Sequence, residues 1–152
     1  MTASDVLSGR PVAHRHRVRV YWEDTDAGGV VYYANYLKFF ERARTEWLRE
    51  RGIGQQALKD EAGTMFVVAE AQIAYRQPAR LDDVLDLELA VLACGRASLE
   101  LLQQARRDGA LLASARIRIG CVDARTLRPC RIPDAVLGCL GRTPDLDPMT
   151  ID

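Results

Sequence analysis

The chain has 152 residues, 48% of them hydrophobic and 28% charged, with 21 basic and 21 acidic side chains. This size and composition are typical of one folded domain with a sizeable core. The zero formal net charge argues against nucleic acid as a partner, and no run of about 18 apolar residues marks a membrane span. We expect one domain at residues 15–141, an arm at 1–14 and a tail at 142–152.

The cysteines and histidines are few and scattered. The four cysteines show no C-x-x-C spacing, and the N-terminal stretch lacks the apolar core of a signal peptide. We therefore expect reduced thiols and a cytoplasmic location. Cysteine catalysis is disfavoured because the two histidines, His14 and His16, are distant from every cysteine in the sequence. They could share one strand face as metal ligands, but no third ligand is near them, so we predict no metal site.

The first regular elements surround a glycine-containing turn. Valine and arginine alternate in RHRVRVYWED, residues 15–24, with the period of a half-buried strand. Residues 35–52 carry apolar side chains at three- and four-residue steps, which predicts an amphipathic helix of about five turns. Asn35 is predicted as its N-cap, and Gly52 stands where a helix commonly ends.

The second half of the chain favours strands. Residues 64–75 form a β-leaning run that ends before Pro78, which cannot donate to a strand ladder. Residues 84–92 and 97–106 follow, and the RDG turn predicts a hairpin into a strand at 111–123. Residues 132–142 predict a short final helix with Pro133 in its first turn.

This order of elements predicts an α+β fold. One helix with an apolar face must cover one side of an antiparallel sheet of about five strands. Such a sheet has exposed edges, and pairing with a second copy of the chain hides one of them.

The segment EDTDAGGVVYYANY, residues 23–36, holds the candidate chemistry. Asp and Gly favour turns, so a plain loop is one interpretation. A calcium loop fails because Gly28 stands at a ligand position and Asn35 replaces the required Glu. A phosphate loop needs a Lys or a G-x-G-x-x-G spacing, which this segment lacks. What remains is a carboxylate before a helix start, whose N–H groups can polarise a carbonyl that the carboxylate attacks directly or through water.

The stretch VRVYWEDTDAGGVVYYANYLKFFERARTEWLRERG, residues 18–52, resembles hotdog-fold acyl-CoA thioesterases of the 4-hydroxybenzoyl-CoA thioesterase family. It is most similar to the Tol-Pal system-associated subgroup. The downstream RQPARLDDVLDLEL, residues 76–89, also resembles that family. The resemblance implies a hotdog fold, a long helix wrapped by an antiparallel sheet, paired as a homodimer or homotetramer. It also implies hydrolysis of acyl-CoA to a carboxylic acid and CoA in the cytoplasm, with peripheral attachment to the inner membrane as an alternative.

The resemblance assigns roles to residues of the loop. It implies that Asp26 is the catalytic carboxylate, as nucleophile or general base, and that the backbone N–H of Tyr33 binds the thioester oxygen. Asp24 is expected to order the loop. Glu41, whose position supplies the acid group in another hotdog subgroup, is expected to be an ordinary helix-face charge.

The substrate pocket is expected to take further residues. Tyr32 and Tyr36 lie near Asp26 in sequence, and a backbone N–H of the partner subunit near Met65 or Phe66 is expected to complete the oxyanion site. CoA enters as part of the substrate, so no cofactor is expected. Its phosphates require arginines, and the candidates are Arg76, Arg80 and Arg96.

One departure from the subgroup concerns Tyr33. The subgroup commonly has His at this position, in GVVYHANY, whereas 4-hydroxybenzoyl-CoA thioesterases can carry Tyr. The exchange removes an imidazole and leaves the backbone N–H in place. It favours an alternative function, namely binding of acyl-CoA, an acyl-carrier protein or a Tol-Pal partner without turnover. A hotdog dehydratase is disfavoured, because such enzymes use a His near the acid group and no His follows His16.

Overall fold

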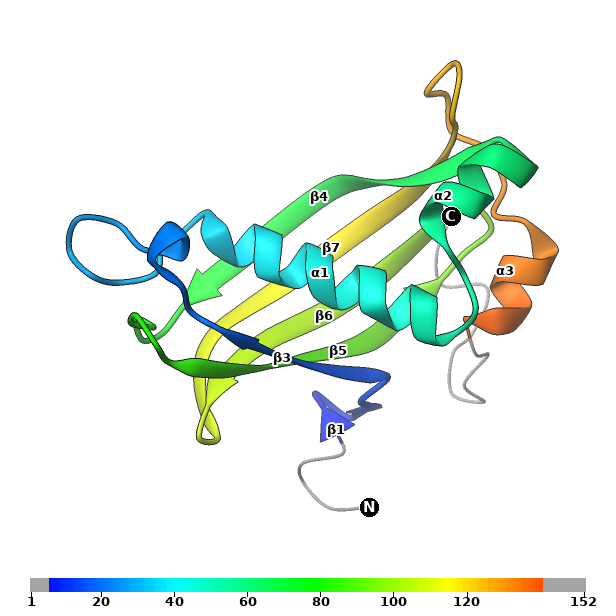
Figure 1. The fold of residues 1–152 in the computed structure, drawn as a ribbon. Coiled ribbons are helices and arrows are strands. Elements are labelled where there is room, and N and C mark those ends of the chain that lie inside the picture. Colours follow the sequence, from blue (N-terminus) through cyan, green and yellow to red (C-terminus); the bar gives the residue numbers. More distant parts are fainter. Residues whose placement is uncertain (1–5, 141–152) are drawn as a thin grey trace.

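The computed structural model describes residues 6–140, and its main sheet has five antiparallel strands with a long helix across one face (Figure 1). The strand order is β3–β5–β6–β7–β4. The strands are β3 (His14–Arg19), β4 (Thr64–Tyr75), β5 (Val84–Cys94), β6 (Ser98–Arg107) and β7 (Ala110–Asp123). The α+β class and the five strands are therefore confirmed. Within the described range, no helix has the length and apolar composition needed to cross a bilayer.

The long helix, α1 (Asn35–Glu50), forms where the apolar period predicted it. Its apolar stripe is buried against the sheet and comprises Tyr36, Phe39, Phe40, Ala43, Trp47 and Leu48. Gly52 follows the helix with a φ of 81°, a conformation that glycine adopts without strain. The prediction of Asn35 as N-cap was wrong. Asn35 is the first helical residue, because its side-chain amide is held by the carboxylate of Asp24.

Two other boundaries differ from the prediction. The first strand ends at Arg19, and the chain then turns through a short 3₁₀ segment, η2 (Trp22–Asp24). This turn forms because the Asp24 carboxylate accepts the Tyr21 N–H at 2.8 Å, which draws the backbone out of the ladder. At the other end of the chain, α3 (Asp134–Cys139) begins after Pro133, which is therefore the N-cap residue and not part of the first turn.

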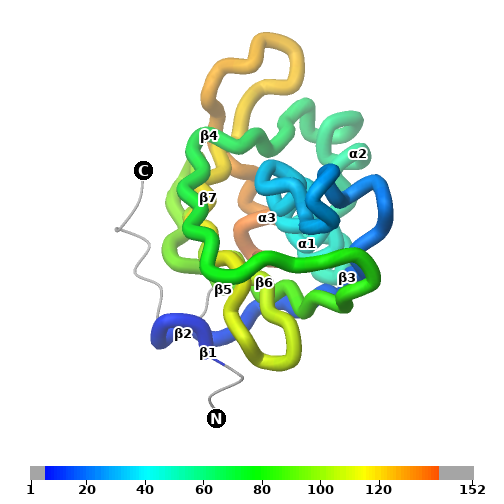
Figure 2. Tube along the Cα trace, turned by 90° about the vertical axis from the view of Figure 1, so that its left-hand side faces the viewer, coloured from blue at the N-terminus to red at the C-terminus, as the bar shows by residue number. Residues whose placement is uncertain are grey.

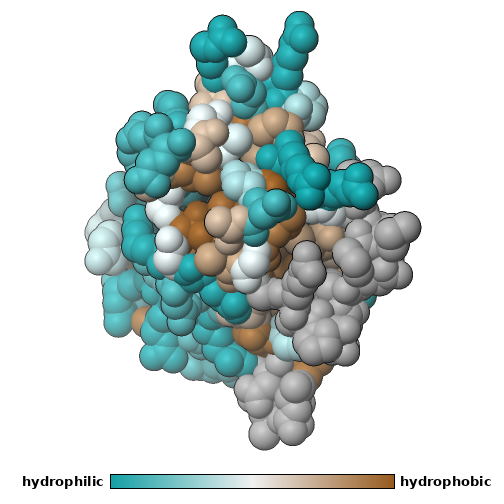
Figure 3. All heavy atoms as spheres, turned by 90° about the vertical axis from the view of Figure 1, so that its right-hand side faces the viewer, coloured by the Kyte–Doolittle hydropathy of each residue, from teal (hydrophilic) through white to brown (hydrophobic). Residues whose placement is uncertain are grey.

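Several short elements were not predicted. The arm contains a two-stranded hairpin of β1 (Val6–Leu7) and β2 (Arg10–Pro11), which lies on the side of the sheet away from α1 (Figure 2). After α1, a helical turn α2 (Gln55–Ala57) continues into a π-helical turn η3 (Leu58–Ala62). On the face that carries α2 and α3, apolar side chains are visible in the centre, with hydrophilic ones to the left of them in this view (Figure 3). The predicted tail at 142–152 lies outside the described residues, and the proposed domain limits stay predictions.

The two faces of the sheet differ because successive side chains alternate. On the α1 side they are buried and apolar, including Leu85, Leu87, Leu89, Leu101, Ile117 and Ile119. The opposite face is charged. Glu88 accepts from Arg15 at 3.3 Å and from Arg106 at 3.0 Å, and Arg17 pairs with Asp86 at 3.0 Å.

One polar side chain lies within the apolar layer and connects it to α1. Gln103 on β6 is fully buried; its Nε2 donates to the Phe40 carbonyl at 3.0 Å, and its Oε1 accepts from Arg44 at 3.1 Å. Both contacts are to α1, whose buried stripe against the sheet is otherwise apolar. Gln103 therefore fixes the position of the helix along the sheet.

We predict that Gln103→Ala lowers the free energy of unfolding by about 2–3 kcal/mol, because it leaves a cavity and removes one hydrogen bond each from the Phe40 carbonyl and the partly buried Arg44 guanidinium. Urea denaturation followed by circular dichroism measures the change. Gln72→Ala is the matched control, since the Gln72 side chain is exposed on β4 and, within residues 6–140, bonds only to Glu70. Equal losses in the two variants would contradict this role of Gln103.

Candidate functional site

A small hairpin connects β3 to α1 and carries the candidate catalytic residue. Thr25 pairs with Val31, and the Asp26 N–H donates to the Val30 carbonyl at 2.9 Å. Gly29 closes the turn with a φ of 77°. The second arm of the hairpin is also tied to the segment after β4, because the Val31 N–H donates to the Ala79 carbonyl at 2.8 Å. The loop is thus a braced structure and not a free connection.

Asp24 holds the base of this hairpin together. It is 3% exposed, its Oδ2 accepts the Tyr21 N–H at 2.8 Å, and its Oδ1 accepts the Asn35 side-chain amide at 2.9 Å. Its own carbonyl accepts the Tyr32 N–H at 3.0 Å. One residue therefore links the exit of β3, the return arm of the hairpin and the first residue of α1. These contacts agree with the predicted loop-ordering role of Asp24.

Asp26 lies in a different environment, although it is only two residues away. Its side chain is exposed, and Oδ1 accepts the Gly28 N–H at 2.8 Å. A Cβ at position 28 would come within 3.1 Å of that oxygen, so glycine permits this contact. Within residues 6–140, Oδ2 accepts no hydrogen bond. Asp26 is thus fixed through one oxygen while the other is available for chemistry.

The chain turns into α1 at Tyr33. The Asn35 N–H donates to the Tyr32 carbonyl at 2.8 Å, and no group in the described part of the chain accepts the Tyr33 N–H. The first turn of α1 contains no acidic side chain that would offset the positive end of its dipole. A free N–H at such a helix start can polarise a carbonyl and stabilise the oxyanion formed from it.

Tyr75, at the end of β4, contacts this turn. Its hydroxyl donates to the Tyr33 carbonyl at 2.9 Å, and the two rings meet edge to face with centroids 6.4 Å apart. Burial, followed by the proximity of Tyr33, raises the pKa of Tyr75. The phenol therefore keeps its proton at neutral pH and remains a hydrogen-bond donor.

The other tyrosines divide between the surface and the core. Tyr32 and Tyr33 are 47% and 62% exposed, with ring centroids 4.8 Å apart, and hydrogen bonding to Tyr33 raises the pKa of Tyr32. Tyr36 is buried against Phe39, Phe40 and Tyr75, and burial raises its pKa. The predicted pocket residues near Asp26 thus form one continuous aromatic cluster.

Other predicted residues are dispersed. Arg80 pairs with Val30 of the hairpin, and Arg76 follows Tyr75. Met65 and Phe66 begin β4, at the opposite end from Tyr75, and Arg96 lies in the turn after β5, also at that far end. A single chain therefore brings Arg80 to the hairpin and places Arg76 at the Tyr75 end of β4, whereas the other three residues lie at the opposite end of the sheet.

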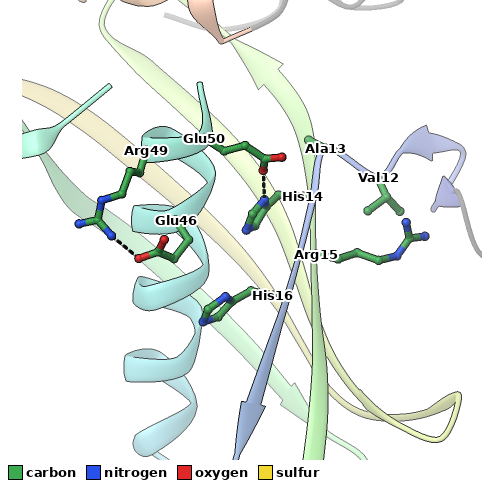
Figure 4. A pocket seen from close by; sticks show the side chains of 8 residues that line it. All are labelled: Val12, Ala13, His14, Arg15, His16, Glu46, Arg49 and Glu50. Carbon is green, nitrogen blue, oxygen red and sulfur yellow. Dashed lines mark hydrogen bonds and ion pairs between the residues drawn. The ribbon is translucent and has the colours of Figure 1, made fainter. Parts of the chain in front are cut away.

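The two histidines and Glu41 lie away from the hairpin. His14 and His16 line a solvent-open cavity of about 640 Å³ between β3 and the C-terminal half of α1, where His14 Nδ1 meets Glu50 Oε2 at 2.6 Å (Figure 4). Within residues 6–140, no three ligand-type side chains are placed to hold a metal ion. Glu41 is exposed on α1, where Thr45 donates to it at 3.3 Å.

Two residues that support the site, Asn35 and Tyr75, were not predicted in these roles. Asn35 was interpreted as a helix cap, and its contact with Asp24 crosses the hairpin. Tyr75 reaches Tyr33 over 42 residues of chain. The only local signal was a tyrosine at the end of a strand, and that pattern does not indicate what its hydroxyl contacts.

A family model described as the thioesterase-like superfamily matches residues 20–140. Among curated proteins, the acyl-CoA thioesterase YbgC of Haemophilus influenzae is 45% identical over 119 residues, which cover 78% of this chain and 88% of that protein. The acyl-CoA thioester hydrolase YbgC of Escherichia coli is 43% identical over 124 residues, covering 81% and 92% of the two chains.

Solved structures have the same fold. A probable thioesterase from Bartonella henselae superposes with a TM-score of 0.74 at 33% identity, covering 79% of this chain and 98% of the other. The structure of a protein from Aquifex aeolicus gives a TM-score of 0.78 at 29% identity and covers 84% and 98%. The predicted hotdog fold and family resemblance are therefore confirmed, and the chain belongs to the thioesterase-like superfamily.

Proposed function

We propose that this protein hydrolyses acyl-CoA thioesters to a carboxylic acid and CoA, with Asp26 as the catalytic carboxylate. The observation that carries the proposal is the braced hairpin, which holds Asp26 through one oxygen and leads directly into the turn where the Tyr33 N–H has no acceptor within residues 6–140. The YbgC relatives named as acyl-CoA thioesterases support the choice of thioester.

The chemistry follows from the two groups. The Tyr33 N–H and the positive end of α1 polarise the thioester carbonyl and stabilise the oxyanion. Asp26 Oδ2 then either attacks the carbonyl carbon, giving a mixed anhydride that water cleaves, or removes a proton from an attacking water. In both routes the C–S bond breaks and CoA leaves as its thiolate.

A second copy of the chain would complete the site. β4 is an edge strand of the sheet, its middle is exposed, and Val68 on its α1 side is 49% exposed because α1 lies over β3 and β5. Two β4 strands paired about a two-fold axis run antiparallel, so the start of one lies beside the end of the other. Met65 and Phe66 of the partner subunit would then approach Tyr75 and Tyr33. The proposed assembly is a homodimer, or a homotetramer of such dimers.

The substrate would lie along the aromatic cluster of Tyr32, Tyr33 and Tyr36. Of the three candidate arginines, we favour Arg80, which pairs with Val30 of the hairpin, and Arg76, which follows Tyr75, as partners for the phosphates of CoA. The peripheral membrane location and an acyl-carrier or Tol-Pal partner stay predictions. Binding without turnover is the alternative function, and an assay of free thiol released from short, long and aromatic acyl-CoAs separates the two.

We predict that Asp26→Asn lowers turnover by about 10²–10⁴-fold, because the amide neither attacks a carbonyl nor accepts a proton. Asn can still accept the Gly28 N–H, so the loop and the melting temperature should be unchanged. Thiol release from acyl-CoA measures turnover, and Asp60→Asn on the exposed η3 turn is the matched control. Wild-type turnover in Asp26→Asn would refute the proposed role.

Asp24→Asn should lower stability more than Asp26→Asn does, and turnover less. One carboxylate oxygen becomes an NH₂ group, which cannot accept the hydrogen bond of Tyr21 or Asn35, so a buried donor loses its partner. We expect a loss of about 1–3 kcal/mol in the free energy of unfolding, with a smaller fall in turnover than for Asp26→Asn. Thermal denaturation alongside the thiol assay compares the two variants. An Asp24→Asn protein of unchanged stability would contradict the bracing role.

Tyr75→Phe should lower turnover about 3- to 10-fold with little change in KM, since one hydrogen bond that orients the Tyr33 turn is lost while the ring packing remains. Steady-state kinetics separates kcat from KM. Tyr21→Phe is the control, because it removes the hydroxyl of an exposed tyrosine in the same region. Gel filtration should give the same size for all three proteins, and an unchanged kcat would exclude a positioning role for Tyr75.

A further inference from the structure

Two of the four cysteines are neighbours at the end of the sheet far from Asp26. Cys121 is near the end of β7, and Cys130 is in the segment that returns along it toward α3. The Cys130 N–H donates to the Cys121 carbonyl at 2.9 Å, and the Asp123 N–H donates to the Arg128 carbonyl at 2.8 Å. The two Sγ atoms are 3.7 Å apart.

This backbone pairing suits a disulfide. Directly opposed residues of antiparallel segments have Cα atoms about 4.5–5.5 Å apart, within the range of about 4.4–6.8 Å that disulfides occupy. The sulfurs are already in van der Waals contact, so side-chain rotation could bring them to bonding distance without moving the backbone. Both cysteines are free in the structure.

The two thiols differ in exposure. Cys121 is 1% exposed, and burial, with the contact to Cys130 second, raises its pKa to about 12. Cys130 is partly exposed, outside the sheet. A thiolate is the reacting form of cysteine, so Cys130 is the residue that an external reagent meets first, and Cys121 is the thiol held ready beside it.

We propose that Cys121 and Cys130 form a reversible disulfide site that responds to two-electron oxidants of the peroxide class. The Cys130 thiolate attacks a peroxide oxygen, the O–O bond breaks, and the products are a sulfenic acid and, after protonation, water. The Cys121 sulfur then displaces hydroxide from the sulfenic sulfur, and its own proton leaves with that hydroxide as a second water. Two thiols are thereby oxidised by two electrons, and one peroxide is reduced to two waters.

The bond would fasten the return segment to the sheet. This segment leads through Ile132, a fully buried core residue, into α3, whose Val136 is also buried. A disulfide that closes this loop restricts the unfolded chain, so the oxidised protein should unfold at a higher temperature than the reduced one. Cys121 also pairs with Phe66 across β4 and β7. The inference is independent of the proposed hydrolysis.

The test uses the full chain carrying Cys94→Ser and Cys139→Ser, which leaves only the pair. Treatment with hydrogen peroxide should remove both free thiols, lower the mass of the protein by two hydrogen atoms and raise its melting temperature. Dithiothreitol should reverse all three changes. Arg125 lies between the cysteines, so trypsin should release two peptides joined only by the disulfide. With Cys130→Ser added to the same background, peroxide treatment should leave the remaining Cys121 thiol and the melting temperature unchanged.

Two results would overturn the proposal. One is a Cys130 oxidised to sulfinic acid beside an unmodified Cys121, and the other is a product with disulfides only between chains. If the serine substitutions prevent folding, peptide mapping of the peroxide-treated wild-type chain decides the same question, because the joined pair of tryptic peptides is either found or absent.

Discussion

The buried carboxylate of Asp24 joins the end of β3 to the start of α1. Its two side-chain oxygens and its carbonyl accept from the Tyr21 N–H, the Asn35 amide and the Tyr32 N–H. A buried carboxylate is costly unless hydrogen bonds satisfy it, and once satisfied in a low-dielectric interior it holds its partners firmly. The position of the hairpin relative to the helix depends on this residue, and with it the placement of Asp26 and of the Tyr33 N–H.

Asp24 and Asp26 illustrate how environment separates two identical side chains. Asp24 is buried, and each of its oxygens already accepts a hydrogen bond from the protein. Asp26 is exposed and is held through one oxygen by the Gly28 N–H. The first arrangement suits a brace, whereas the second suits a group that must meet a carbonyl without moving far.

The geometry of the sheet is the basis for proposing that a second subunit completes the site. α1 covers the β3 and β5 side, and the long β4 edge keeps an exposed middle with a bulge between Val68 and Glu70. Within one chain, the predicted oxyanion segment at Met65 and Phe66 lies at the opposite end of β4 from Tyr75. Antiparallel pairing of β4 with β4 of a second subunit would bring Met65 and Phe66 of the partner subunit close to Tyr75. It would also cover the exposed side chains of Val68 and Tyr75.

The sequence by itself determined most of the local structure, because hydrophobic period and turn residues act over a few positions. The apolar steps of α1 and the limits of β4 at Thr64 and Tyr75 could be predicted, and the motif around Asp26 indicated the family that the comparisons confirm. Asn35 was misassigned as a cap because local propensity does not include a carboxylate eleven residues earlier. Only the tertiary structure decided the contacts between distant segments, namely Tyr75 with Tyr33 and Gln103 with α1. Such contacts depend on strand order and register, which place residues side by side regardless of their separation along the chain.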